Sequence, residues 1–151
     1  MKSLLIVYHS QSGTCARFAA AVAAGAAREE GIAVTVRRAW DAGVSDLAAA
    51  DGVVVIAAEN SGALSGAMKD FLDRCFYPAI QRGLVLPYAL LLSAGNDGRG
   101  AQREAERILS GIPFTRATET QILRGEFCDE YGTRSEEIGQ AFAAGLAMGI
   151  F

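Results

Sequence analysis

The chain has 151 residues, of which 51% are hydrophobic and 21% are charged, and its net charge is −3 at pH 7. This length and composition favour one globular domain over residues 1–151 and exclude an intrinsically disordered protein. Nucleic-acid binding is disfavoured because the Lys and Arg residues form no cluster beyond Arg37-Arg38.

No apolar run approaches the roughly 18 residues of a membrane-spanning helix, so we expect no membrane partner. The first apolar run, at residues 4–8, is too short for the central region of a signal peptide. Three cysteines without a Cys-x-x-Cys pair agree with a reducing compartment, and one histidine excludes a zinc site built from several histidines. We therefore expect a cytoplasmic protein without a metal centre.

Strand-like and helix-like segments alternate along the chain, which predicts a parallel sheet covered by helices on both faces. The last helix is predicted to start at Thr133, because Glu136 three residues later completes a capping box. In chain order the segments are a strand at 4–8, a helix at 14–29, a strand at 32–38, a short helix at 46–51, a strand at 52–58, a helix at 65–81, a strand at 88–94, a helix at 100–110, a strand at 119–123 and the last helix.

The composition of the strands predicts their order in the sheet. The first, third and fourth strands are apolar throughout, so both of their faces are buried, whereas the second and fifth alternate as edge strands do. The doubly wound order 2-1-3-4-5 places these two strands outside. We therefore predict an α/β fold, a three-layer doubly wound sandwich with a five-stranded parallel sheet. Ligands bind such sheets beyond the carboxyl ends of the strands, here between the first and third.

Three loops at that predicted edge are rich in Gly, Ser and Asn. They are "HSQSGT" after the first strand, "ENSGALSG" after the third and "SAGNDGRG" after the fourth, and together they hold six of the seventeen glycines. One such loop is weak evidence for a site. Because all three leave central strands at one edge, their combination predicts a binding site there.

The first loop leads into a helix, whose first backbone N–H groups favour an anion. Ser10, Ser12 and Thr14 add hydroxyl donors, and Gly13 allows the backbone to close around the ligand. The loop suits a phosphate monoester held by neutral donors. It lacks the lysine of a Walker A loop and the G-x-G-x-x-G pattern of a dinucleotide fold. A plain Ser/Thr helix cap is the alternative interpretation.

The same loop resembles the phosphate loop of flavodoxins, since "SQSG" at residues 10–13 matches their hydroxyl-rich pattern. The segment "ENSGALSGAMKDFLDR" at residues 59–74 resembles NAD(P)H-dependent FMN reductases and flavodoxin-like quinone reductases, where a Gly-x-x-x-Gly opens the helix as Gly62 and Gly66 do here. "SAGNDGRG" fits their third flavin-contacting loop. The resemblance covers essentially the whole chain and implies a single flavodoxin-like domain that binds the phosphate of FMN.

The resemblance also implies the cofactor-binding residues. They are Ser10, Gln11, Ser12, Gly13, Thr14, Cys15, Glu59, Asn60, Ser61, Gly62, Ala94, Gly95, Asn96, Asp97 and Gly98. The second and third loops depart from many flavodoxins because they contain no aromatic residue. An aromatic against the flavin would then come from Trp40, Phe127, Tyr131 or a second subunit of a homodimer.

The leading function that the resemblance implies is an NAD(P)H-dependent oxidoreductase that reduces a quinone, a nitro compound or a redox partner protein. The first alternative is a flavodoxin-type one-electron carrier, and the second is a non-catalytic module that binds a phosphorylated ligand or partner. The flavin carries the chemistry in the first two cases, so no catalytic residue is assigned.

Several single residues have competing interpretations. His9 is either a proton-transfer residue or a strand-end histidine bonded to the backbone, and Cys15 is either a redox sensor or a packing residue. Glu59 either opposes negative charge on a reduced flavin or is a solvated loop carboxylate. The arginines at 99, 103 and 107 form either a solvated helix face or a surface for a partner or for NADPH phosphates.

Overall fold

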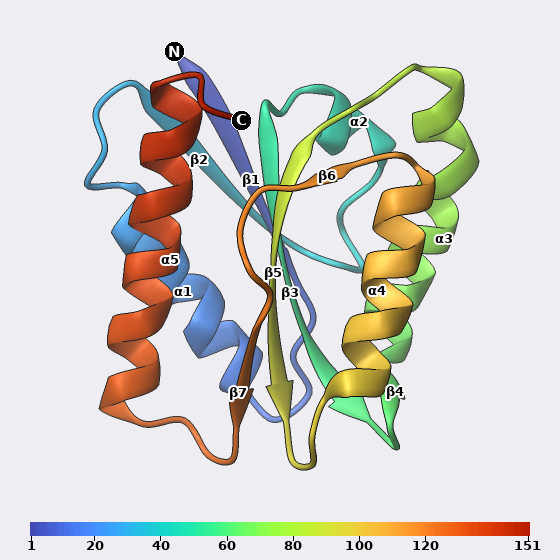
Figure 1. Ribbon diagram of the computed structural model, residues 1–151, viewed down its shortest axis with the longest axis vertical. Helices are drawn as coiled ribbons and strands as arrows, with labels where there is room; N and C mark the ends of the chain where they lie inside the picture. Colours follow the sequence, from blue (N-terminus) through green and yellow to red (C-terminus); the bar gives the residue numbers. More distant parts are fainter.

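Four long parallel strands form most of the sheet in a computed structural model that describes residues 1–151. They are β1 (Lys2–Tyr8), β2 (Ile32–Arg38), β3 (Gly52–Asn60) and β5 (Pro87–Ala94). The sheet order is β2-β1-β3-β5-β6, which confirms the predicted doubly wound order in the α/β class (Figure 1). Chain order reverses between β1 and β3, where Leu4 pairs with Gly52 and Tyr8 with Ile56.

The fifth strand was predicted at 119–123, but two short strands occupy its place in the sheet, and the first of them lies outside the predicted range. β6 (Thr115–Arg116) pairs with the start of β5, and β7 (Gln121–Arg124) pairs with its end. Residues 117–120 between them hold three polar residues and leave the ladder, and the hydroxyl of Thr120 bonds to Glu106 instead. A further strand that the sequence did not predict, β4 (Ala63–Leu64), runs antiparallel to the end of β3.

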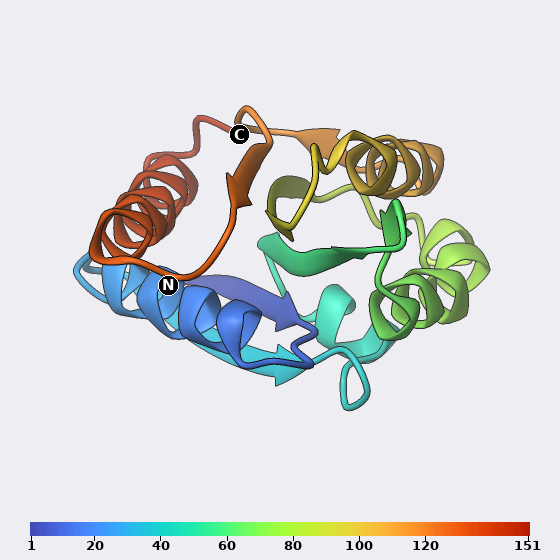
Figure 2. The same cartoon turned by 90° about the horizontal axis from the view of Figure 1, so that it is seen from below.

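Helices cover both faces of the sheet, as predicted. α1 (Thr14–Ala26) and α5 (Asp129–Ala147) lie on one face, whereas α2 (Val44–Ala48), α3 (Gly66–Gln81) and α4 (Arg99–Gly111) lie on the other (Figures 1 and 2). None of these helices combines the length and the apolarity needed to cross a lipid bilayer.

Two predicted helix starts were wrong. α5 begins four residues before Thr133, after Cys128 in an extended conformation, because Asp129 and Glu130 in the first turn interact favourably with the positive end of the helix dipole. α2 begins at Val44, before the predicted residue 46. Its start is fixed by the Asp46 carboxylate, which accepts the backbone N–H of Gly43 at 2.9 Å.

Alternation along the strands produces two cores. Leu4 and Ile6 pack with α1 and α5, whereas Leu5 and Val7 pack with α3 and α4, so β1 is apolar on both faces. The edge strand β2 is more exposed. α1 and α5 pack with their backbones in contact, because Gly139 lies against the carbonyl of Val22 where any side chain would collide. The sheet is therefore packed between its two helical layers.

Candidate functional site

The three predicted loops meet at the carboxyl edge of the sheet, which confirms their convergence. The side-chain amide of Asn60, at the end of β3, donates to the Gln11 side chain in the first loop at 3.2 Å. The Glu59 carboxylate reaches the third loop, where it accepts the backbone N–H groups of Asn96 at 3.2 Å and Gly98 at 2.9 Å. Side chains at the end of β3 thus connect all three loops.

The first loop ends in an open helix N-terminus. Gly13 is the N-cap of α1 with a φ of 102°, and a Cβ built there would meet nothing within 4 Å. Its N–H donates to the Ser10 hydroxyl at 3.0 Å, which holds the loop in shape. The amides of Thr14, Cys15 and Ala16 have no acceptor within the helix, since they belong to its first turn.

The loop hydroxyls lie beside those amides. The hydroxyl oxygens of Ser12 and Thr14 are 3.4 Å apart, and both side chains are partly or fully exposed. The arrangement offers several neutral donors to one anion, and the helix dipole adds a positive potential at the same point. The geometry fits a terminal phosphate group.

Cys15 contributes only its backbone to this loop. Its side chain is buried against the core, and that burial raises the pKa of the thiol to about 12. A buried thiol with a raised pKa is a poor nucleophile, so the structure favours the packing interpretation of Cys15 over the redox-sensor interpretation.

The second loop is a β-hairpin that the sequence analysis missed. Ser61 and Gly62 lie between the paired residues Asn60 and Ala63, with φ values of 52° and 79°. Two consecutive residues with positive φ form a type I′ turn, and a glycine at the second position is its usual signal. The carbonyl of Gly62 lies directly against Gly100 in the first turn of α4, where a side chain would collide with it.

Glu59 has a role that neither sequence interpretation described. It is half-buried, and its carboxylate accepts two amides of the third loop immediately before α4. Asp97 in the same loop accepts the N–H of Arg99 at 3.1 Å, and its own carbonyl accepts the Arg124 guanidinium at 2.7 Å. The third loop is thus held from two sides.

A fourth loop, residues 125–128 after β7, lies beside the first. Phe127 packs on Phe18 at 5.6 Å between ring centroids, and the Arg17 guanidinium lies 3.8 Å from the Phe127 ring centroid. The Tyr131 hydroxyl donates to the carbonyl of Arg124 at 2.6 Å. Phe127 and Tyr131, two of the aromatic residues proposed from the sequence to contact the flavin, therefore make contacts within the protein itself.

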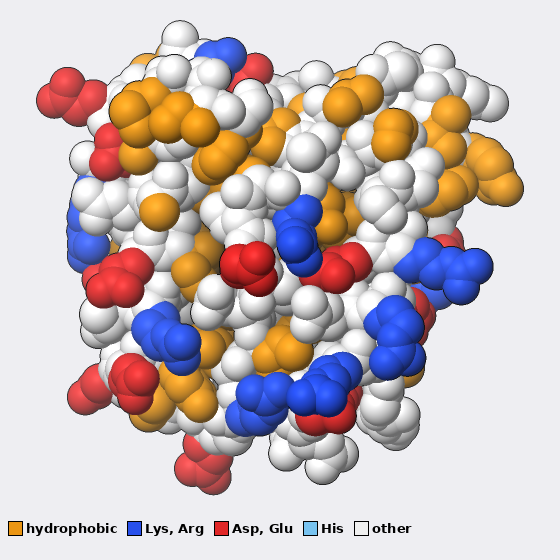
Figure 3. Space-filling view, in the orientation of Figure 1, with side chains coloured by type: hydrophobic (Ala, Val, Ile, Leu, Met, Phe, Trp, Pro, Cys, Tyr) orange, Lys and Arg blue, Asp and Glu red, His pale blue; other side chains and the backbone are white.

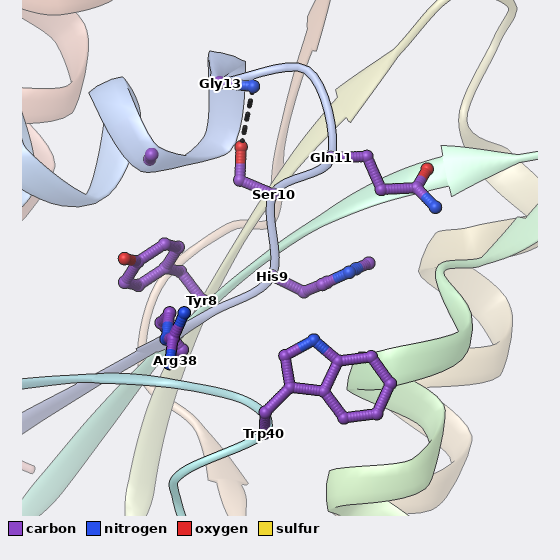
Figure 4. A pocket seen from close by; sticks show the side chains of 8 residues that line it. Tyr8, His9, Ser10, Gln11, Gly13, Arg38 and Trp40 are labelled. Atoms are coloured by element: carbon purple, nitrogen blue, oxygen red, sulfur yellow. Dashed lines mark hydrogen bonds between the residues drawn. The ribbon is translucent and has the colours of Figure 1, made fainter.

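A pocket of about 270 Å³ lies against the first loop at the side of β2. Figure 4 shows Gln11, His9 and Trp40 extending to one side of the chain, with Tyr8 and Arg38 on the other. The Trp40 side chain is 62% exposed, and its ring lies edge-on to His9 at 6.0 Å between centroids. The pocket thus joins an accessible aromatic surface to the open helix N-terminus.

His9 is buried in this pocket wall. Its backbone N–H donates to Ile56, but the side-chain Nδ1 has no protein partner, so the predicted side-chain bond to the backbone is not formed at that atom. Burial lowers the pKa of His9, and the imidazole is therefore neutral at pH 7.

The fold and the three convergent loops define a flavodoxin-like α/β protein. The chain belongs to the NADPH-dependent FMN reductase family, whose model matches residues 36–119, more than half of its length. The matched region contains the second and third loops. No curated protein matches the sequence.

Three solved structures share the fold of this chain at sequence identities of 16–18%. A flavodoxin from the domain Archaea superposes with a TM-score of 0.84 at 18% identity, over 96% of this chain and 99% of its own. A WrbA-like flavodoxin from Agrobacterium tumefaciens gives 0.82 at 17% identity, over 98% and 99%. Rubredoxin oxygen:oxidoreductase from Desulfovibrio gigas gives 0.83 at 16%, over 99% of this chain but only 37% of that protein.

Proposed function

We propose that the protein binds FMN at these loops and acts as an NADPH-dependent oxidoreductase on a quinone, a nitro compound or a redox partner protein. The observation that carries the proposal is the open N-terminus of α1, where free amides and the hydroxyls of Ser12 and Thr14 surround an uncrowded Gly13. Family membership supports FMN as the phosphate ester and NADPH as the reductant.

Different loops bind different parts of FMN in this proposal. Ser10, Ser12, Gly13 and Thr14 with the first amides of α1 hold the phosphate. Residues 59–62 and 94–98 contact the ring system, mainly through their backbones, because Glu59 and Asn60 are engaged in holding the loops together. FMN held by these residues would supply the redox chemistry, namely hydride acceptance and electron transfer.

Trp40 is the aromatic residue that we assign to the flavin side of the site. Phe127 and Tyr131 are engaged with Arg17, Phe18 and Arg124 within the protein, whereas Trp40 is exposed in the pocket beside the first loop. It is also the only tryptophan of the chain, so its emission reports on this site alone.

A flavodoxin-type one-electron carrier is the second candidate. It is supported by the hydroxyl-rich first loop and by the similarity in fold to the archaeal flavodoxin over nearly the full length of both chains. The two candidates differ in whether NADPH reduces the bound flavin directly.

Anaerobic addition of NADPH to the FMN-loaded protein tests the proposal. We expect the visible flavin bands to bleach within the time of an enzymatic turnover, whereas free FMN with NADPH alone stays oxidised. Bleaching by dithionite but not by NADPH or NADH would reject the oxidoreductase and favour the carrier. A protein that takes up no flavin at all would reject both.

A further inference from the structure

The outward face of α4 carries a row of three arginines. Arg99, Arg103 and Arg107 lie four residues apart on one side of the helix, so the row is about 12 Å long at a rise of roughly 1.5 Å per residue. All three side chains are exposed, and none of them forms an ion pair with a carboxylate of the protein.

The acidic residues of α4 are engaged away from this face. Glu106 accepts the Thr120 hydroxyl at 2.6 Å and the Arg116 guanidinium at 3.3 Å, both on the side of β6 and β7. Glu104 accepts the backbone N–H of Leu64 at 3.4 Å, on the side of the hairpin. The carboxylates thus belong to the flanks of the helix, and the outward face is cationic.

Like charges four residues apart destabilise a helix, so the folded chain alone gives no reason for this row. The position of the row suggests a reason for it. Arg99 directly follows the third loop, and the row leads away from the candidate site. Arg124 adds a further positive charge at the carboxyl edge of the sheet, where its guanidinium donates to the carbonyl of Asp97 in the third loop. Figure 3 shows Lys and Arg side chains gathered over α4 and the carboxyl edge of the sheet.

We propose that the α4 arginine row is a docking surface for the acidic face of a protein that accepts electrons at the neighbouring site. The inference rests on the proposed function, since it names the partner class of that site. Arg103 and Arg107 line a wide, open recess of about 430 Å³ together with Arg116 and Glu106. A protein fits this surface better than a nucleotide, because the row is exposed along its length and is not enclosed. The balanced reaction is one NADPH and two oxidised one-electron carriers giving NADP⁺, one proton and two reduced carriers.

Binding of fluorescently labelled poly-L-glutamate to the full chain tests the surface without requiring flavin reduction. The test variant is R103E/R107E, which leaves Arg99 beside the third loop unchanged. The matched control is R82E/R134E, which reverses two exposed arginines that form no ion pair and changes the net charge equally. Circular dichroism and FMN uptake check that both variants keep the fold and the site.

We expect the dissociation constant to rise at least about tenfold in R103E/R107E and to stay near the wild-type value in the control, with binding weakened by salt in every case. An equal loss in both variants would show that only net charge matters and would overturn the proposal. No binding to the wild type would also overturn it. So would a loss of 2′,5′-ADP binding in R103E/R107E, because the row would then be a nucleotide site. A failure of NADPH to bleach the flavin would count against the proposed function and leave these binding results unaffected.

Discussion

Gly13 sets the shape of the first loop at the scale of a single residue. Its φ of 102° is accessible to glycine without cost, and the space around its Cβ position is open. The Ser10 hydroxyl accepts its N–H, so the residue links the end of β1 to the first turn of α1. The anion site therefore depends on the backbone conformation at one position.

Replacing Gly13 by Val tests that dependence. A β-branched residue at this φ costs roughly 1–2 kcal/mol, and relief of the strain moves the amides, so FMN affinity should fall more than about tenfold while the fold persists. The control is Gly31→Val, because Gly31 has a φ of 78° and open space but lies at the opposite edge of the sheet. FMN titration and thermal melts measure both variants. Equal loss of FMN affinity in the two would contradict the assignment.

His9 makes stability depend on pH. Burial lowers its pKa in the folded protein below the ordinary value of 6.5, so the unfolded chain binds the proton more strongly. The contribution of the neutral imidazole is fully present above pH 6.5 and is lost as the pH falls below it, toward the lowered folded pKa. We expect denaturant melts to show a fall in unfolding free energy over this window that is smaller in His9→Asn. An identical pH profile in the two proteins would show that His9 is not responsible.

At the scale of elements, long buried strands were predictable and short features were not. The apolar runs of β1, β3 and β5 follow from burial of both faces, and they fix the sheet order. The two-residue strand β4 has no periodicity to detect, although Ser61-Gly62 between pairing residues was a usable turn signal. The hydrogen bonds from Asn96 and Gly98 to the Glu59 carboxylate join residues 37 and 39 positions apart in the sequence, so only the folded chain shows them. The capping box at Thr133 was misleading because acidic residues earlier in the sequence start α5 first.

The contact between the hairpin and α4 leads to a prediction for Gly100. A methyl group there would collide with the carbonyl of Gly62, so Gly100→Ala should displace the hairpin and cost about 1–3 kcal/mol of stability. FMN affinity should fall with it if residues 59–62 contact the ring. Gly66→Ala is the matched control, because Gly66 also lies in a first helical turn but has open space. Unchanged stability and FMN binding in Gly100→Ala would show that the hairpin is not held there.

At the scale of the whole molecule, the candidate site and the arginine row lie at one edge of the sheet. The carboxyl ends of β1, β3 and β5 bring the three loops together, and α4 begins there with its arginine row. The net charge of −3 conceals this local positive face, which composition alone did not reveal. The sequence predicted the loops because their composition repeats at equivalent places in the fold. It did not predict how side chains connect the loops, because such contacts depend on tertiary distances.

The central claim is that the first loop holds the phosphate of FMN, and parallel titrations with FMN and riboflavin test it most directly. Quenching of the Trp40 emission follows both ligands, since the chain has no other tryptophan. Two or more hydrogen bonds to a charged phosphate predict at least about a hundredfold preference for FMN. Ser12→Ala should reduce that preference by about tenfold, the effect of roughly 1–2 kcal/mol. Equal affinity for the two flavins in the wild-type protein would contradict the account.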